Sequence, residues 1–211
     1  KIVFFGLNRK NHKDFIRTNF DFLINAAMPS KRFWAKNNPK LDYVETVEKT
    51  IFFCREFRFK KFIHISSVSA RCQLNTIYGE NKKKSEDIVL KDRENLILRL
   101  GPMYGENLDK GVLIDMLKSK KVYIDGASKY SFTDINWIGK WLVDNINKYS
   151  GVKEIGSKDS ITLSELARKI NSTSTFEGLI DNQLIEDLEE YDSKSNYVYK
   201  FLNDFKKHQT I

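Results

Sequence analysis

Residues 62–86 read FIHISSVSARCQLNTIYGENKKKSE and join a predicted strand to a predicted helix. The apolar run ends in Ser66 and Ser67, and a polar loop then leads to Tyr78, four residues before Lys82. Residues four apart on a helix share a face, so this spacing predicts that Tyr78 and Lys82 are neighbours. Ligands of α/β proteins bind at the carboxyl ends of parallel strands, which is where the two serines stand. The stretch therefore predicts both a fold and a site.

The segments on either side of this stretch also alternate between predicted strands and predicted helices. Short apolar runs rich in β-branched and aromatic residues predict buried parallel strands at 1–7, 20–27, 60–66 and 95–101. Apolar residues spaced by three or four predict helices at 41–57 and 78–91. Strands that alternate with helices form a parallel sheet with crossover helices. The predicted fold is therefore Rossmann-like α/β.

Beyond residue 101 the alternation loosens. Helices are predicted at 112–118, 136–149 and 162–170, and a strand is predicted at 121–126. Thr162 and Glu165 form a capping box at the start of the third helix. The segments LIDNQLIEDLEEY (179–191) and YVYKFLNDFKK (197–207) predict one or two more helices. We expect a core domain at 1–150 and a small carboxyl-terminal lobe at 151–211.

The composition narrows the class of protein. A chain of 211 residues that is 41% hydrophobic is long enough to bury a sizeable core. It contains no apolar run long enough to span a bilayer and opens with no secretory signal, so we expect a soluble, cytoplasmic protein without a membrane partner. Cys54 and Cys72 are too few for a disulfide framework, and with three histidines they offer no zinc-ligand spacing. We expect free thiols and no metal.

The net charge of +8 favours anionic partners such as nucleic acid, a membrane surface or a phosphorylated small molecule. A solvated, lysine-covered surface is the simpler interpretation of this charge, and a nucleic-acid partner is not the expected one. Lys31, Arg32 and Lys129 are candidates to contact a substrate diphosphate, although a plain surface role is simpler for each.

The Tyr-x-x-x-Lys spacing alone is a weak signal, because a lysine-rich chain contains it by chance. A second example, Tyr149 and Lys153, serves as a comparison. Gly151 lies between these two residues and breaks the helix that would place them on one face. Only Tyr78 and Lys82 follow a strand that ends in serines.

The residue types at this position suit proton transfer. A phenol has an ordinary pKa near 10, and a nearby ammonium lowers that pKa by stabilising the phenolate. Lys82 is expected to act on Tyr78 in this way. A serine hydroxyl such as that of Ser67 donates to or accepts from a substrate oxygen that alternates between alcohol and carbonyl. Removing hydride from the same carbon requires a nicotinamide, because no side chain accepts hydride.

Several motifs together resemble a known family. The motifs FIHISSVS, YGENKKKSE, LILRLGPMYGE, YSFTDINWIGKWL and EIGSKDSITLSELARKI have the order and character of extended short-chain dehydrogenases/reductases. The resemblance covers about residues 1–170 and is to the NAD-dependent epimerase/dehydratase group, which acts on nucleotide sugars. It implies an NAD or NADP cofactor, a nucleotide-sugar substrate, a carboxyl-terminal lobe on the substrate side and a possible homodimer.

The resemblance also implies roles for individual residues. Ser67 is the implied catalytic serine, Tyr78 the acid/base, and Lys82 the partner of the tyrosine and a ligand of the nicotinamide ribose. The implied cofactor-binding residues are Asn25, Ala26, Ala27, Ser66, Tyr78, Lys82 and Pro102.

The chain departs from the family pattern at its start. The family begins with a strand and a G-x-x-G-x-x-G turn that lets the backbone approach the pyrophosphate, and this sequence contains no such turn. The segment KIVFFGLNRKN resembles the third strand of the family, with Leu7 after Gly6 in place of an acidic contact near the adenine. We expect the first two strands of the family to be absent from this chain. The alternative is a natural protein that has lost them.

A second departure bears on the reaction. The sugar 4,6-dehydratases of this group carry two carboxylic residues after the catalytic threonine, whereas this chain has Val68 and Ser69. Neither side chain can move the protons of a dehydration, so the pattern favours 4-epimerisation or carbonyl reduction.

Two other kinds of protein fit parts of the sequence. A non-catalytic binding protein for RNA or a nucleotide would explain the positive charge and the missing glycine turn, but it has no need of serine, tyrosine and lysine at these positions. An inactive fragment of a larger enzyme is the third interpretation.

Overall fold

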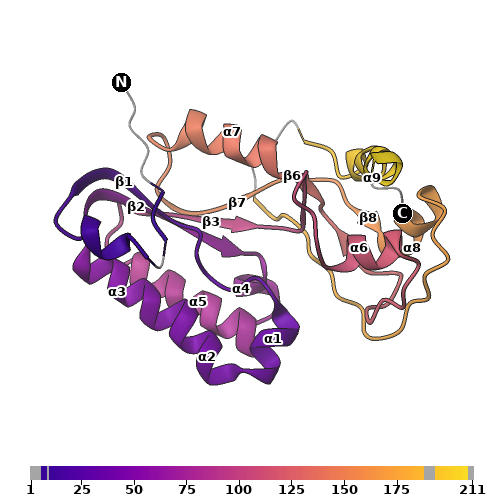
Figure 1. Cartoon of the computed structure of the whole chain (residues 1–211), viewed down its shortest axis with the longest axis horizontal. Coiled ribbons are helices and arrows are strands. Elements are labelled where there is room, and N and C mark those ends of the chain that lie inside the picture. Colours follow the sequence, from indigo (N-terminus) through magenta and orange to yellow (C-terminus); the bar gives the residue numbers. More distant parts are fainter. Residues whose placement is uncertain (1–5, 9, 188–192, 209–211) are drawn as a thin grey trace.

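Within the residues that the computed structural model describes (6–8, 10–187 and 193–208), four parallel strands form the central sheet in the order β1–β2–β3–β7 (Figure 1). They are β1 (Asn19–Asn25), β2 (Arg58–Ser67), β3 (Leu96–Leu100) and β7 (Gly151–Ile155). This parallel sheet with flanking helices confirms the predicted Rossmann-like α/β class. The strand predicted at 1–7 falls mostly outside the described residues.

Neighbouring residues of β2 point to opposite faces of the sheet, as the pleat of a strand requires. Phe62 is fully buried against residues of α3 (Lys49–Glu56) and α5 (Ile77–Val89). Ile63 is fully buried on the other face, in a cluster with Ile138 of α7 (Ile135–Asn145). Figure 1 shows α3 and α5 on one side of the sheet and α7 on the other. Burying each such side chain stabilises the fold by roughly 1.5–3 kcal/mol.

The predicted helix at 41–57 forms in three consecutive pieces. They are α2 (Pro39–Tyr43), a π-helical turn at Val44–Glu48 and α3. Pro39 occupies the first turn, where its missing N–H costs nothing. Three short helical elements were not predicted, namely a 3-10 turn at His12–Phe15, α1 (Arg32–Asn37) and α4 (Ser69–Cys72).

A second hydrophobic core lies in the carboxyl-terminal lobe, to the side of the sheet in Figure 1. Its fully buried members include Met116, Leu163 and Leu202. The lobe contains α6 (Val112–Leu117), β5 (Lys129–Tyr130), β8 (Ile161–Thr162), α8 (Leu163–Lys169) and α9 (Tyr197–His208). The short strands β4 (Met103–Tyr104) and β6 (Thr133–Asp134) pair where the lobe meets the sheet. Thr162 caps α8 by accepting a hydrogen bond from the Glu165 N–H at 3.2 Å, as predicted.

The structure divides the chain differently from the expected boundary at residue 150. Residues 151–155 are strand β7, which pairs with β3 because its apolar end, Ile155, is buried in the core of the sheet. Residues 112–132 instead contribute Leu113, Met116 and Phe132 to the core of the lobe. The sheet domain therefore includes residues 151–155, and the lobe includes residues from 112–132, so neither part is one continuous stretch of the chain.

Two other predictions about the lobe are wrong. The strand predicted at 121–126 forms only a single bridge, between Val122 and Phe176. The described part of the helix predicted at 179–191 forms no helix, and its polar groups bond to other parts of the molecule. The rest of that segment, 188–191, lies outside the described residues. The helix predicted at 197–207 is present as α9.

Candidate active site

Helix α5 begins at a well-defined point, which fixes the position of Tyr78. The Thr76 hydroxyl accepts a hydrogen bond from the Gly79 N–H at 3.0 Å and so caps the helix. A Cβ on Gly79 would lie 2.1 Å from the Gln73 carbonyl oxygen, so only glycine fits there. Tyr78 is consequently held in the first turn, with 7% of its surface exposed.

Tyr78 and Lys82 are brought together, as their spacing predicts. The Lys82 ammonium lies over the Tyr78 ring, 5.2 Å from its centroid. Lys82 is 3% exposed, and no group in the described part of the chain accepts a hydrogen bond from its ammonium. Burial lowers the pKa of Lys82 to about 8, although Asp42 and Glu86 act to raise it. The ammonium is not among the fully buried polar atoms without a partner, so it reaches solvent, and its unused donors are available to a ligand.

Ser67 also lies at this site. It ends β2, and its hydroxyl accepts a hydrogen bond from the Ser69 N–H at 3.2 Å. Burial raises the pKa of the Tyr78 phenol above its ordinary value, whereas hydrogen bonding from Ser67 and the charge of Arg32 act to lower it. The phenol is therefore protonated at neutral pH. That Lys82 lowers this pKa stays a prediction.

Ser66 has a different environment from Ser67. Its hydroxyl donates to Glu86 at 2.6 Å, and Arg99 binds both oxygens of the same carboxylate at 2.9 and 2.6 Å. The preceding residue of α5, Ser85, bonds to His64 at 2.9 Å. Burial lowers the pKa of His64 to about 3, so it is a neutral core residue. These groups satisfy one another, which indicates a structural role for Ser66 in this state of the molecule.

The segment predicted to line the cofactor follows β1. Asn25 is buried, with its amide nitrogen 3.4 Å from Thr50 and 3.4 Å from His64. Ala26 and Ala27 are exposed, and the Ala27 carbonyl accepts a hydrogen bond from Lys49 at 3.2 Å.

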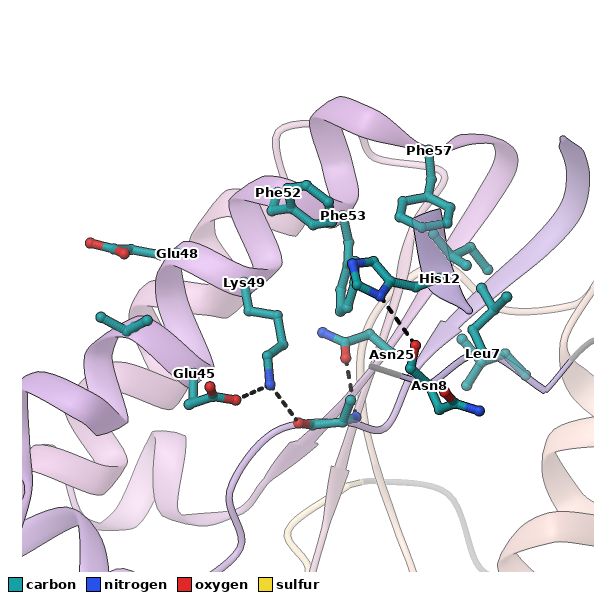
Figure 2. Close-up of a pocket in the computed structure, with 14 residues that line it drawn as sticks. Leu7, Asn8, His12, Asn25, Glu45, Glu48, Lys49, Phe52, Phe53 and Phe57 are labelled. Atoms are coloured by element: carbon teal, nitrogen blue, oxygen red, sulfur yellow. Dashed lines mark hydrogen bonds and ion pairs between the residues drawn. The ribbon is translucent and has the colours of Figure 1, made fainter. Parts of the chain in front are cut away.

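A cavity of about 750 Å³ lies beside this segment (Figure 2). Asn25, Ala27 and Lys49 border it, and the aromatic rings of Phe52, Phe53 and Phe57 give it a largely apolar wall. Figure 2 shows the Lys49 side chain paired with Glu45 on one side of the cavity, where Lys49 also donates to the Ala27 carbonyl. Tyr78 and Lys82 do not line it, so the cavity adjoins the predicted cofactor segment but not the tyrosine.

Pro102 follows β3 and is half-buried, with its carbonyl accepting a hydrogen bond from the Thr133 N–H at 3.0 Å. Ser67 pairs with Leu100, so Pro102 lies at the same carboxyl edge of the sheet as Ser67.

Residues 181–187, which we name the strap, also lie at this edge. Arg71 donates to the Leu184 carbonyl at 3.0 Å and pairs with Glu154 at 2.7 Å. Ile185 is buried over Gly101 and Gly156, where a Cβ would approach it to 3.3 and 3.2 Å. Arg32 and Gln73 bind Asp181. The strap is part of the site that sequence reasoning missed, because its partners lie far away along the chain.

Other kinds of site are not found in the described residues. Among them no group of three or more histidine, cysteine, aspartate or glutamate side chains could hold a metal ion, and no helix is long and apolar enough to cross a membrane. Cys54 and Cys72 are both free thiols.

No model of a known protein family matches this chain, and no curated protein matches it. Solved structures do. The UDP-glucose 4-epimerase of Thermotoga maritima, solved with UDP-glucose, superimposes with a TM-score of 0.76 at 14% identity, over 90% of this chain and 78% of its own. An NAD-dependent NDP-hexosamine 5,6-dehydratase of tunicamycin biosynthesis gives 0.75 at 15% identity, over 93% and 80% of the two chains.

A third structure, the UDP-glucuronic acid 4-epimerase of Bacillus cereus with UDP-glucuronic acid and NAD, gives a TM-score of 0.67 at 19% identity, over 88% of this chain and 76% of its own. At such identities the likeness is one of fold. The chain has the Rossmann-like fold of these solved nucleotide-sugar enzymes.

Proposed function

We propose that this chain carries the acid/base site of an NAD(P)-dependent enzyme that epimerises or reduces a nucleotide-activated sugar. The fold shared with solved enzymes of this kind supports the class of substrate. The group of Ser67, Tyr78 and Lys82 at the carboxyl edge of the sheet supports the class of chemistry.

The observation that carries the proposal is the largely buried ammonium of Lys82. Partial removal of an ammonium from water without a protein partner is unfavourable, and burial lowers the pKa of Lys82 accordingly. Strongly shifted titratable groups of this kind gather at functional sites. A ligand hydroxyl that accepts from Lys82 would recover part of that cost, which favours a binding role over a structural one.

In this proposal Tyr78 exchanges a proton with a hydroxyl of the sugar ring. Its protonated phenol donates to a carbonyl oxygen, and in the reverse direction the phenolate accepts the proton of the alcohol. Ser67 holds the same oxygen as it changes between the two forms. Lys82 stabilises the phenolate as it forms.

The residues present fit the nicotinamide part of NAD(P), which supplies the hydride acceptor and donor when bound. Lys82 offers free donors for ribose hydroxyls, and Tyr78 lies next to it. The cavity beside Asn25 and Ala27 gives room for a ligand along the end of β1. Ala26, Ser66 and Pro102 are the other proposed neighbours of the cofactor.

The side chains after Ser67 bear on the choice of reaction. Val68 and Ser69 are both buried, and neither carries a carboxyl group. An elimination of water needs a base at carbon and an acid at the leaving oxygen. We therefore propose epimerisation or carbonyl reduction rather than 4,6-dehydration.

The test is turnover of a panel of nucleotide sugars with NAD and NADP by the wild type and by Tyr78→Phe. Loss of the phenol is expected to lower kcat by about 10²–10⁴-fold. Tyr149→Phe is the matched control, because it removes the same hydroxyl from the second Tyr-x-x-x-Lys pair, and it should leave kcat unchanged. Equal turnover by wild type and Tyr78→Phe would remove Tyr78 from the mechanism.

A further inference from the structure

Asp181 of the strap is the centre of a hydrogen-bond cluster. One carboxylate oxygen accepts from Arg32 at 2.5 Å and from the Tyr130 hydroxyl at 3.0 Å. The other accepts from Gln73 at 2.7 Å and from Gln183 at 2.8 Å. A carboxylate has about four acceptor positions, so Asp181 is fully engaged.

The backbone around Asp181 belongs to the carboxyl-terminal lobe. The Asp181 N–H donates to the Ser128 hydroxyl at 2.9 Å, and the Gln183 N–H donates to the Lys129 carbonyl at 2.9 Å. Arg32 and Gln73, in contrast, belong to segments that pack beside the sheet. The Asp181 carboxylate therefore ties the lobe to the sheet.

This tie lies at the amino-terminal end of α5, where Tyr78 is. The Gln73 carbonyl accepts from the Thr76 N–H at 3.0 Å and from its hydroxyl at 2.8 Å, and it packs on Gly79. Helix α1, which begins with Arg32, packs against α5. Gln73, which packs on the first turn of α5, and Arg32, from a helix that packs against α5, thus both bind Asp181.

Arg32 is suited to this position because it keeps its charge. Burial acts to lower the pKa of Arg32, but Tyr130 and Asp181 outweigh it and the pKa is raised. Its planar guanidinium also binds Asp181 and the Tyr130 hydroxyl, at 3.2 Å, at the same time. The charge of Arg32 on α1 acts to lower the pKa of Tyr78 and that of Asp42 on α2 acts to raise it, while the Lys82 ammonium of α5 lies over the ring.

We propose that Arg32 is a positioning residue for Tyr78, held beside the start of α5 by Asp181, so that docking of the carboxyl-terminal lobe completes the acid/base site. The inference rests on the proposed function in taking Tyr78 as the acid/base. It assigns Arg32 a role other than the plain surface one that the sequence suggested.

The test is the pKa of Tyr78, followed by NMR in protein labelled at the tyrosine Cζ carbon and assigned with Tyr78→Phe. Arg32→Gln is expected to raise this pKa by about one unit, the low end of what one neighbouring charge does. Arg32→Lys should restore part of the shift. Lys31→Gln removes the same charge from the exposed neighbouring residue and should leave the pKa of Tyr78 unchanged.

Asp181→Asn separates positioning from simple charge. If Asp181 holds Arg32 in place, the substitution frees the guanidinium and the pKa of Tyr78 rises, as in Arg32→Gln. If Asp181 acts only through its negative charge, the pKa falls. An unchanged value in Arg32→Gln, or a fall in Asp181→Asn, overturns the proposal, and Arg32→Gln against Arg32→Lys decides it should Asp181→Asn not fold. The titration needs no cofactor, so its outcome is independent of whether nucleotide sugars are turned over.

Discussion

The chain contains two tyrosine–lysine pairs with the same spacing, and both lysines lie over their tyrosine rings. The distance from ammonium to ring centroid is 5.2 Å for Lys82 on Tyr78 and 4.7 Å for Lys153 on Tyr149. The second pair achieves this without a helix, because Gly151 has a φ of +73° and begins strand β7. Neither the spacing nor the proximity of the two side chains therefore distinguishes a site.

The surroundings of the two pairs do differ. Tyr149 stacks on Trp141 with ring centroids 5.6 Å apart, and Lys153 lies 3.8 Å from Asp187. Both residues are partly exposed. Tyr78 and Lys82 are buried, and the Lys82 donors lack a described acceptor. The two pairs therefore differ in burial and in the partners of the lysine, not in spacing.

Among the effects described below, the largest is the expected loss of activity when the Ser67 hydroxyl is removed. If the surroundings of Tyr78 matter, Ser67→Ala should lower kcat by about 10²-fold, since a positioned hydroxyl is lost from the reacting oxygen. The free energy of unfolding of Ser67→Ala, measured in urea, should be close to that of the wild type, because the Ser67 hydroxyl makes few structural hydrogen bonds.

Ser66→Ala is compared with Ser67→Ala because the Ser66 hydroxyl is bound to Glu86. The substitution removes the bond to the buried Glu86 carboxylate and should lower the free energy of unfolding by about 1–3 kcal/mol. Steady-state kinetics and urea unfolding on both variants check the pair. Equal losses of activity in the two variants would contradict the claim that Ser67 contacts the reacting oxygen and Ser66 does not.

A smaller effect is expected on the free energy of unfolding at acidic pH. The pKa of His64 is about 3 in the folded protein against 6.5 ordinarily, through burial and then the charge of Lys82. Between these two pKa values, His64 is protonated in the unfolded chain and neutral in the folded protein. The stability contribution of neutral His64 is full above pH 6.5 and is lost as the pH falls, by about 1.4 kcal/mol per pH unit.

Urea unfolding between pH 7 and pH 5 measures this slope. His64→Gln should flatten it, whereas the control His12→Gln should not. Lys82→Met should also raise the pKa of His64 in an NMR titration, and Lys153→Met should leave it where it is. A slope unaffected by His64→Gln would contradict the assigned cause.

The sequence predicted those features that depend on local pattern. Strand β2 and helix α5 follow from an apolar run and from helical spacing, so the placement of Ser67, Tyr78 and Lys82 could be predicted. The strap could not, because LIDNQLIEDLEEY has helical spacing, whereas partners distant along the chain hold Asp181 in a segment that forms no helix.

The one signal that bears on these distant contacts is the choice of arginine in a lysine-rich chain. Arg32, Arg71 and Arg99 all form part-buried ion pairs with carboxylates. Arginine suits such pairs because its planar fork bonds to both oxygens of a carboxylate and stays charged. Because arginine is rarer than lysine in this chain, its presence at position 32 favours an ion pair over a plain surface role.

The most direct test of the central claim, that the Tyr78–Lys82 pair is a ligand site and the Tyr149–Lys153 pair is not, is calorimetric binding of NAD and NADP with and without UDP-glucose. The account predicts binding to the wild type, affinity at least about tenfold lower for Lys82→Met, or roughly 1.4 kcal/mol, and wild-type affinity for Lys153→Met. Wild-type affinity in Lys82→Met, or an equal loss of affinity in Lys153→Met, would contradict this claim.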